Sequence, residues 1–207
     1  MRLAAVFVPV LVAGSFLSGS ARAEVFHDAE ALEAAEFELG FEGEFLFNDQ
    51  ASELENEALV YGHFGFGIGR GLDLAGRMSF FSEDTVFGGD LQYGPLDDGE
   101  GYPAFSVYAG GHFVDLPEKD AAADFWGLDG GIIMSESILE QVFFIGYDVD
   151  VNFRPEDDRA RIDQRVIVGA RIIMSEHLSF FIEGGYAPRS RDEETRHYIS
   201  GGPKLYF

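Results

Sequence analysis

The sequence predicts an all-β protein, a transmembrane antiparallel up-and-down β-barrel of about ten strands. Three observations carry this prediction. The chain divides into successive segments of about ten residues in which apolar and polar side chains alternate, as barrel strands do. The connectors between these segments are short and long in turn. Beyond the N-terminal region no apolar run reaches the ~18 residues of a transmembrane helix.

The N-terminal region has the features of a secretory signal peptide. Arg2 supplies a positive charge, residues 3–17 are mostly apolar and uncharged, and Ala21 and Ala23 form a small-residue cleavage site. An uncleaved anchor helix is the alternative, but the apolar run is shorter than the ~20 residues that a span requires. We therefore expect a signal peptide over residues 1–23, a short periplasmic lead over 24–35 and a barrel domain over 36–207.

The composition excludes several classes of protein. The chain contains no cysteine, so an exported form has no disulfide framework. Loss of residues 1–23 removes two arginines, and 12 bases then face 37 acids, for a net charge of −25. Such a charge argues against nucleic-acid binding, which needs lysine and arginine for the phosphates. Hydrophobic residues at 46% and aromatic residues at 14% argue against disorder.

The first predicted strand, residues 36–47, shows the alternation most clearly. Its odd positions are apolar at Phe37, Leu39, Phe41, Phe45 and Phe47, and its even positions include Glu36, Glu38, Glu42 and Glu44. At period two these acids share one face, whereas at helical pitch they would scatter around the axis. A charge facing lipid is costly, so in a barrel the phenylalanines face outward and the glutamates face the lumen. A soluble sandwich with the opposite orientation has the same alternation.

Nine further segments follow the same rule. Their residues are 59–69, 72–81, 86–96, 104–114, 125–134, 139–151, 165–174, 178–187 and 198–207. In the segment 139–151, Gln141 lies on the parity of the apolar residues, which leaves the register of that strand less certain. Residues 132–136 recur as 172–176, which fits either chance similarity of two hairpins or a duplication.

The connectors suggest which end of the barrel is which. Residues 70–71, 135–137 and 175–177 are predicted tight turns, and 48–57, 115–124, 152–161 and 188–197 are longer, polar and charged. Short turns at one end and long loops at the other are typical of outer-membrane barrels. Residues 82–85 are short for a loop, and 97–102 are long for a turn. Merging of these strands would give eight, so we expect ten strands with eight as the alternative.

The C-terminal residues carry a recognisable motif. Ser200, Gly202, Leu205 and Phe207 supply a polar residue, a glycine, a hydrophobic residue and a terminal aromatic residue. With this ending the sequence resembles the small outer-membrane β-barrel proteins of the OmpA/OmpX type. The resemblance implies an outer-membrane location and recognition of the last strand by the barrel-assembly machinery. Pro203 departs from the pattern, since it lacks the N–H of a ladder hydrogen bond.

The inward-facing positions collect a set of charged residues. Its acids are Glu36, Glu38, Glu42, Glu44, Asp73, Asp90, Asp129 and Glu183, and its bases are Arg77, Arg171 and Lys204. Counting along the strands places Arg77 near His63 and near Asp90. Closure between the first and last strands would place Lys204 near Glu36 or Glu38. Buried charges need partners, so a salt-bridge network that fills the lumen is expected, with an ion path as the alternative.

Catalytic and ligand motifs are weaker. A rim enzyme would need His112 beside Asp148 or Asp150, but these residues come from strands that are not neighbours. The glycine-rich residues 65–71 lack the lysine of a nucleotide loop. Residues 148–159 start like a calcium loop but carry Phe153 and Arg159 where that loop needs glycine and glutamate. We therefore expect no cofactor and no bound metal.

These patterns favour a non-enzymatic outer-membrane barrel with a structural or surface-interaction role and an acidic, largely filled lumen. Its expected partners are outer-membrane lipid and the barrel-assembly machinery. A small cation-favouring pore with weak, intermittent conductance is one alternative, because the inward acids outnumber the inward bases. An enzyme at the rim that acts on lipid or protein is the other.

Overall fold

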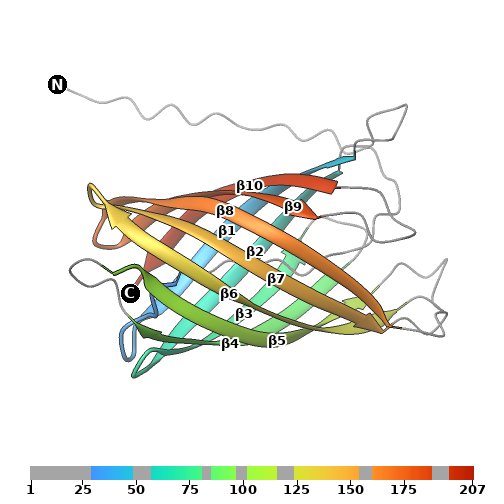
Figure 1. Cartoon of the computed structure of the whole chain (residues 1–207), viewed down its shortest axis with the longest axis horizontal. Coiled ribbons are helices and arrows are strands. Elements are labelled where there is room, and N and C mark those ends of the chain that lie inside the picture. The colour runs from blue at the N-terminus through green and yellow to red at the C-terminus, as the bar shows by residue number, and fades with distance from the viewer. Residues whose placement is uncertain are drawn as a thin grey trace.

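The computed structural model describes residues 29–48, 57–80, 85–96, 102–115, 124–153, 160–187 and 196–207, which form a closed antiparallel barrel (Figure 1). The strands are β1 (Phe37–Asn48), β2 (Glu57–Gly69), β3 (Leu72–Phe80), β4 (Thr85–Leu96), β5 (Ala104–Asp115), β6 (Phe125–Ile138), β7 (Gln141–Phe153), β8 (Arg161–Ser175), β9 (Leu178–Ala187) and β10 (Arg196–Tyr206). Each strand pairs with the next, and β1 pairs with β10. The predicted fold and ten strands are confirmed, and the eight-strand alternative is wrong. In the described ranges no helix is long and apolar enough to cross a membrane.

The alternation of side chains in β1 shows how the sequence sets the two faces of the wall. Phe41 and Phe45 are 57% and 42% exposed on the outside, whereas Glu42 and Glu44 are 1% and 0% exposed on the inside. Successive residues of a strand point to opposite faces. The phenylalanines therefore lie outward and the glutamates inward, as the sequence predicts for a barrel.

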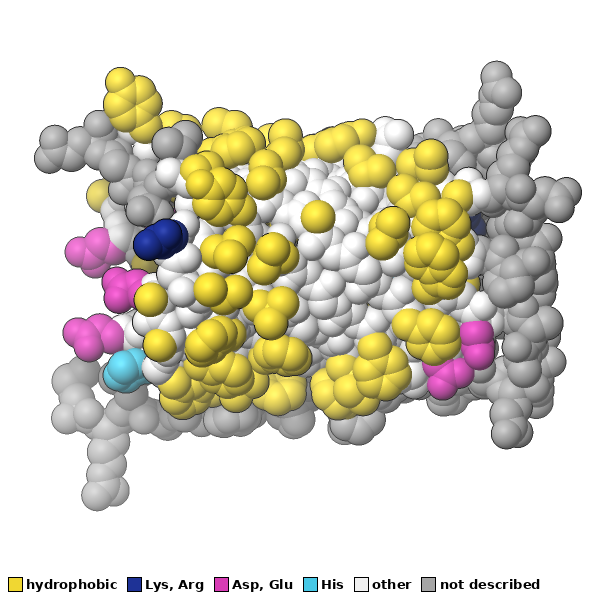
Figure 2. Space-filling model, turned by 90° about the horizontal axis from the view of Figure 1, so that it is seen from below, with side chains coloured by type: hydrophobic (Ala, Val, Ile, Leu, Met, Phe, Trp, Pro, Cys, Tyr) yellow, Lys and Arg dark blue, Asp and Glu magenta, His cyan; other side chains and the backbone are white. Residues whose placement is uncertain are grey.

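The outer surface is apolar between the two ends of the barrel. Away from the strand ends, no outward-facing position of the described strands carries a charged side chain. Figure 2 shows hydrophobic side chains over the barrel wall and charged ones confined to its two ends. Aromatic residues lie towards both margins, with Tyr93 at one and a stacked pair, Trp126 and Phe153, at the other. This apolar band with aromatic margins is the exterior of a membrane-spanning barrel.

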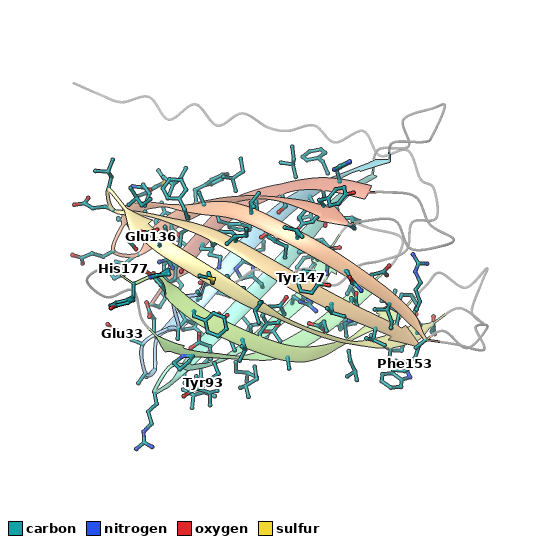
Figure 3. All side chains as sticks on the ribbon, in the orientation of Figure 1. Glu33, Tyr93, Glu136, Tyr147, Phe153 and His177 are labelled. Carbon is teal, nitrogen blue, oxygen red and sulfur yellow. The ribbon has the colours of Figure 1, made fainter. Side chains whose placement is uncertain are left out.

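The two ends of the barrel differ in their connectors. One end, here called the turn end, carries the short connections 70–71, 139–140 and 176–177 and the start of β1. The opposite end, the loop end, is where 49–56, 81–84, 116–124, 154–160 and 188–195 connect the strands. Figure 3 shows Glu136 and His177 at the turn end and Phe153 at the loop end.

The predicted turn at residues 135–137 is wrong. Strand β6 continues to Ile138, and the turn is formed by Leu139 and Glu140, whose φ angles are 54° and 63°. Positive φ angles at both central positions suit a two-residue hairpin turn, for which asparagine and glycine are the usual residues. Leu139 and Glu140 give no such signal, so the sequence pointed to the serines instead. Gln141 is then the first residue of β7, and the apolar side chains at the odd positions of β7 from Phe143 onward face outward, as the sequence predicted for this strand.

Strand β8 also begins earlier than predicted. It starts at Arg161 rather than Arg165, and Asp163 and Arg161 pair with Asp150 and Asn152 of β7. These residues are charged and polar because they line the lumen side of the two strands. Charged and polar residues next to a loop have the composition of the loop, so the predicted start of β8 was placed four residues too late.

The orientation of β1 generates a prediction on stability. Phe41→Arg places a charge on the lipid-facing wall near the middle of the strand, and we expect it to lower the free energy of unfolding by about 2–4 kcal/mol. Glu42→Gln, one residue away on the lumen side, should lower it by less. Urea unfolding in lipid vesicles measures both. Equal losses at the two positions would contradict the assigned faces.

Candidate functional site

The lumen is packed with polar side chains that are shut off from solvent. Its residues with less than one tenth of their surface exposed include nine acids, three bases and two histidines: Glu38, Glu42, Glu44, Asp73, Asp90, Asp129, Asp148, Asp150, Glu183, Arg77, Arg165, Lys204, His63 and His112. In a water-filled pore such side chains would be exposed. Two cavities among them have volumes of about 20 and 10 Å³, each with room for roughly one water molecule.

The first charged cluster lies where the barrel closes. Lys204 on β10 and His63 on β2 both approach the carboxylate of Glu38 on β1, each with a nitrogen–oxygen distance of 3.0 Å. The ring of Phe181 packs against both bases, at 5.5 Å from the Lys204 ammonium and 6.2 Å from the His63 ring. One buried carboxylate therefore links the first, second and last strands.

The second cluster is centred on Asp129 of β6. Arg77 of β3 donates a hydrogen bond of 3.0 Å to one Asp129 oxygen, and it lies 3.8 Å from Asp90 of β4. His112 of β5 places Nδ1 3.3 Å from the other Asp129 oxygen. Arg77 reaches past β4 and β5 to make its shortest contact. Four strands are thus tied together by one carboxylate and its partners.

His112 continues this cluster towards β7. Its Nε2 is 2.9 Å from Oδ1 of Asn152 and 3.7 Å from Oδ1 of Asp150. Strands β5 and β7 are not neighbours, as the sequence indicated, but the side chains meet across β6. The His112–Asp150 contact that was doubtful from the sequence is therefore present in the structure.

A third cluster is centred on Asp148 of β7. Arg165 of β8 donates two hydrogen bonds to one of its oxygens, at 2.9 and 2.6 Å. Tyr108 of β5 donates its hydroxyl to the other oxygen at 2.6 Å. Hydrogen bonds to an ionised partner are stronger than those between neutral groups, so this carboxylate is held from two sides.

Glycines make room for these contacts. Along one register row, Arg77 faces Gly88, Gly88 faces His112, His112 faces Gly127 and Gly127 faces Asn152. A Cβ at Gly88 would lie 2.6 Å from Nε of Arg77, and one at Gly127 would overlap the His112 ring. Arg77 and His112 therefore each lean over the glycine of the next strand to reach a strand that is not adjacent to their own.

Apolar clusters border the polar residues on two sides. One joins Tyr61, Val86, Val114, Phe125 and Phe181, which come from five strands. The other joins Ala29, Ala104, Tyr108, Ile133, Phe144 and Ile167. Phe125 also packs edge-on against the His112 ring at 6.4 Å. The lumen is thus filled like the core of a soluble protein.

The structure brings together most of the residues predicted for the charge network. Glu38 contacts Lys204, and Arg77 contacts Asp90 and Asp129. Glu183 accepts a hydrogen bond of 2.7 Å from the Tyr198 hydroxyl. Glu42 is buried on the same face of the wall.

Arg171 lies apart from the rest of that network. It forms an ion pair with Glu30, a residue of the lead that precedes β1. Glu36, also expected in the lumen, accepts a hydrogen bond of 2.9 Å from the Glu33 amide in an exposed setting at the turn end. The sequence offered Glu36 or Glu38 as the partner of Lys204, and the structure places Glu38 in that contact.

Sequence reasoning missed the pair of Arg165 with Asp148. The sequence offered Asp148 as a possible partner of His112, but Arg165 was not counted among the inward bases. The two residues are direct ladder partners, so the register of the hairpin would have paired them. Sequence reasoning considered His112 beside Asp148 or Asp150 but did not identify the Tyr108 contact, and both side chains reach β7 across an intervening strand. Within the described ranges, no group of three or more histidines and acids is placed to hold a metal ion.

The C-terminal motif lies in the seam between β10 and β1. Ser200 and Gly202 face inward, and Leu205 and Phe207 are 39% and 68% exposed. Phe207 exchanges two backbone hydrogen bonds with Phe37, at 2.9 and 3.1 Å. Recognition of this motif by the barrel-assembly machinery stays a prediction.

No protein-family model and no curated protein matches the sequence. Solved structures that resemble it include Ail, the attachment invasion locus protein of Yersinia pestis, in complex with sucrose octasulfate, at 9% identity, with 85% of this chain and 100% of that chain covered and a TM-score of 0.33. Neisserial surface protein A gives 9% identity, 83% and 96% coverage and a TM-score of 0.36. The outer membrane protein OprG from Pseudomonas aeruginosa gives 10% identity, with 87% of this chain and 99% of that chain covered and a TM-score of 0.30. Such distant likenesses carry no argument about the function of this chain.

The glycine spacing generates a second prediction. Gly127→Ala adds a methyl group where the His112 ring and the side-chain Oδ1 of Asn152 lie, and we expect the free energy of unfolding to fall by about 1–3 kcal/mol. Gly43→Ala is the matched control, because a Cβ there meets nothing within 4 Å. Thermal or urea unfolding of both variants provides the comparison. An equal effect of the two substitutions would show that the lumen can accommodate a methyl group at Gly127 without loss of stability.

Proposed function

We propose that this chain is a bacterial outer-membrane β-barrel with a structural or surface-interaction role, exerted through its ends rather than by transport through its lumen. The burial of its inward charges is the observation that carries this proposal. Arg77, Asp129 and Lys204 are each at most 5% exposed and are engaged by partners. A chain whose purpose is permeation would keep such residues wet.

The outer-membrane location has separate support. The barrel has an uncharged outer wall, the N-terminus has the features of a secretory signal, and the C-terminus ends in the motif Ser200–Phe207. At the loop end the connecting segments are acidic by sequence. Residues 49–56 carry three acids and no base, although they lie outside the described residues. These segments are the part of the chain that we propose meets a surface partner.

The residues that a rim enzyme would need are buried in the barrel wall. His112 and Asp150 do approach each other, but they are 5% and 2% exposed. Phe125 packs against the His112 ring on the lumen side. A lipid or protein substrate would have to reach a residue within hydrogen-bonding distance of the histidine, and this pair is enclosed by the barrel wall and its neighbours.

A small cation-favouring pore remains the second candidate, and one observation favours it. Nine buried acids face three buried bases and two histidines among the described residues. Any water that entered the lumen would therefore be at a negative potential, which attracts cations and repels anions. This candidate requires the side chains that fill the lumen to move aside.

Planar-bilayer recording separates the two candidates. We expect no conductance steps from the wild type, and steps with cation selectivity from Arg77→Ala, which removes both a space-filling side chain and a positive charge. The reversal potential under a salt gradient gives the selectivity, and Gly43→Ala serves as the control. Regular cation-selective steps from the wild type would refute the sealed lumen and favour the pore. Anion selectivity in any variant would contradict the electrostatic argument.

A further inference from the structure

The segment before β1, residues 29–36, lies in the mouth of the barrel at the turn end. Its anchor is a backbone amide, that of Leu32, which donates to both carboxylate oxygens of Asp73 at 3.1 and 3.0 Å. Asp73 faces inward from β3 and is 4% exposed. A buried carboxylate that receives a backbone N–H from another segment is a recognition contact, because it fixes the position of the peptide and not only its charge.

Backbone hydrogen bonds fix the same segment to β2. The amide of Ala35 donates to the Gly67 carbonyl oxygen at 2.8 Å, and the Gly67 amide donates to the Glu36 carbonyl oxygen at 2.9 Å. Between these two bonds the chain turns, because the Glu36 amide donates to the Glu33 carbonyl oxygen at 3.0 Å and Ala35 has a φ angle of 69°. The segment is therefore bound through its main chain at two places.

The segment packs directly against three glycines of the barrel wall, Gly65, Gly67 and Gly94. A Cβ at Gly67 would coincide with the Glu33 carbonyl group, one at Gly65 would lie 3.0 Å from Leu32, and one at Gly94 would lie 3.1 Å from the Ala29 carbonyl oxygen. Side chains at these positions would occupy the volume that the segment now fills. The sequence thus leaves space for a peptide backbone at the turn end.

The far end of the segment is held by side chains. Glu30 forms an ion pair with Arg171 of β8 and accepts a hydrogen bond of 3.2 Å from Ser137 of β6. Ala29 is 1% exposed and packs in the cluster that contains Tyr108 and Phe144. The contacts therefore extend from β2 and β3 on one side of the mouth to β6 and β8 on the other.

We propose that the turn-end mouth is a peptide-binding site whose ligand is this chain's own segment, residues 29–36, and that the bound segment seals the lumen at that end. The site recognises the backbone of the segment through Asp73 and Gly67, and an acidic side chain through Arg171. The acid lies two residues before the amide that Asp73 binds. This inference is independent of what the loop end does.

A disulfide tests whether the segment occupies the site. The chain has no cysteine, so any disulfide that forms in a variant must join the introduced cysteines. A Cβ at Gly94 lies 3.5 Å from that of Ala31, within the range of disulfides. Ala31→Cys with Gly94→Cys should cross-link nearly completely in folded protein under mild oxidation. Ala31→Cys with Tyr93→Cys is the matched control, because Tyr93 points away from the barrel (Figure 3) and should not cross-link.

Displacement of the segment tests recognition. In the cysteine-pair background, Gly67→Ala should slow cross-linking at least tenfold, while Gly43→Ala should leave the rate unchanged. Glu30→Arg should slow it as well, and Glu30→Arg with Arg171→Glu should restore it. A shift in gel mobility between unheated and boiled samples shows that each barrel is folded.

Two results would overturn the proposal. The first is a folded barrel in which the Ala31–Gly94 pair does not cross-link. The second is unchanged cross-linking in both Gly67→Ala and Glu30→Arg, which would mean that the segment lies at the mouth without being recognised there. If Gly67→Ala does not fold, the Glu30 and Arg171 exchange decides the question alone, and failure of the exchange to restore the rate counts against recognition.

Discussion

The structure depends on the need of a charge buried in the lumen to find a partner away from water. Removal of one member of a buried ion pair typically costs about 3–5 kcal/mol, because the remaining charge is left uncompensated. Arg77, Asp129 and His112 meet this need together, and Lys204, His63 and Glu38 meet it at the seam. The glycines opposite these side chains follow from the same constraint, since a partner on a strand that is not adjacent is reached only over a position without a side chain.

The two faces of the wall are set by opposite rules that use the same alternation. Lipid excludes charge from the outside, where Phe41 and Phe45 lie, and the packed interior admits charge only when it is paired. Apolar clusters around Phe125 and around Ala29 enclose the paired charges. The barrel is therefore stabilised by side chains packed throughout its interior. Its turn end is occupied by residues 29–36, so the surface role that we propose falls to the loop end.

The sequence predicted the parts of this arrangement that depend on local alternation. The strand set, the inward position of Glu42 and the contact of Lys204 with Glu38 all follow from parity and from closure of the barrel. The contact of His112 with Asn152 could not be predicted, because it depends on the register of three strands and on the gap at Gly127. The turn at Leu139 lacks the usual residues, and the binding of residues 29–36 rests on backbone amides that carry no motif.

A double-mutant cycle on Arg77 and Asp129 measures whether the buried charges stabilise the barrel as mutually dependent pairs. Arg77→Met, Asp129→Asn and the double variant are unfolded with urea in lipid vesicles. Each single change should lower the free energy of unfolding by about 3–5 kcal/mol, and the double change by about 1–3 kcal/mol less than the sum of the two. Losses that add to within about 0.5 kcal/mol would show that the two residues are independent, and would contradict the account.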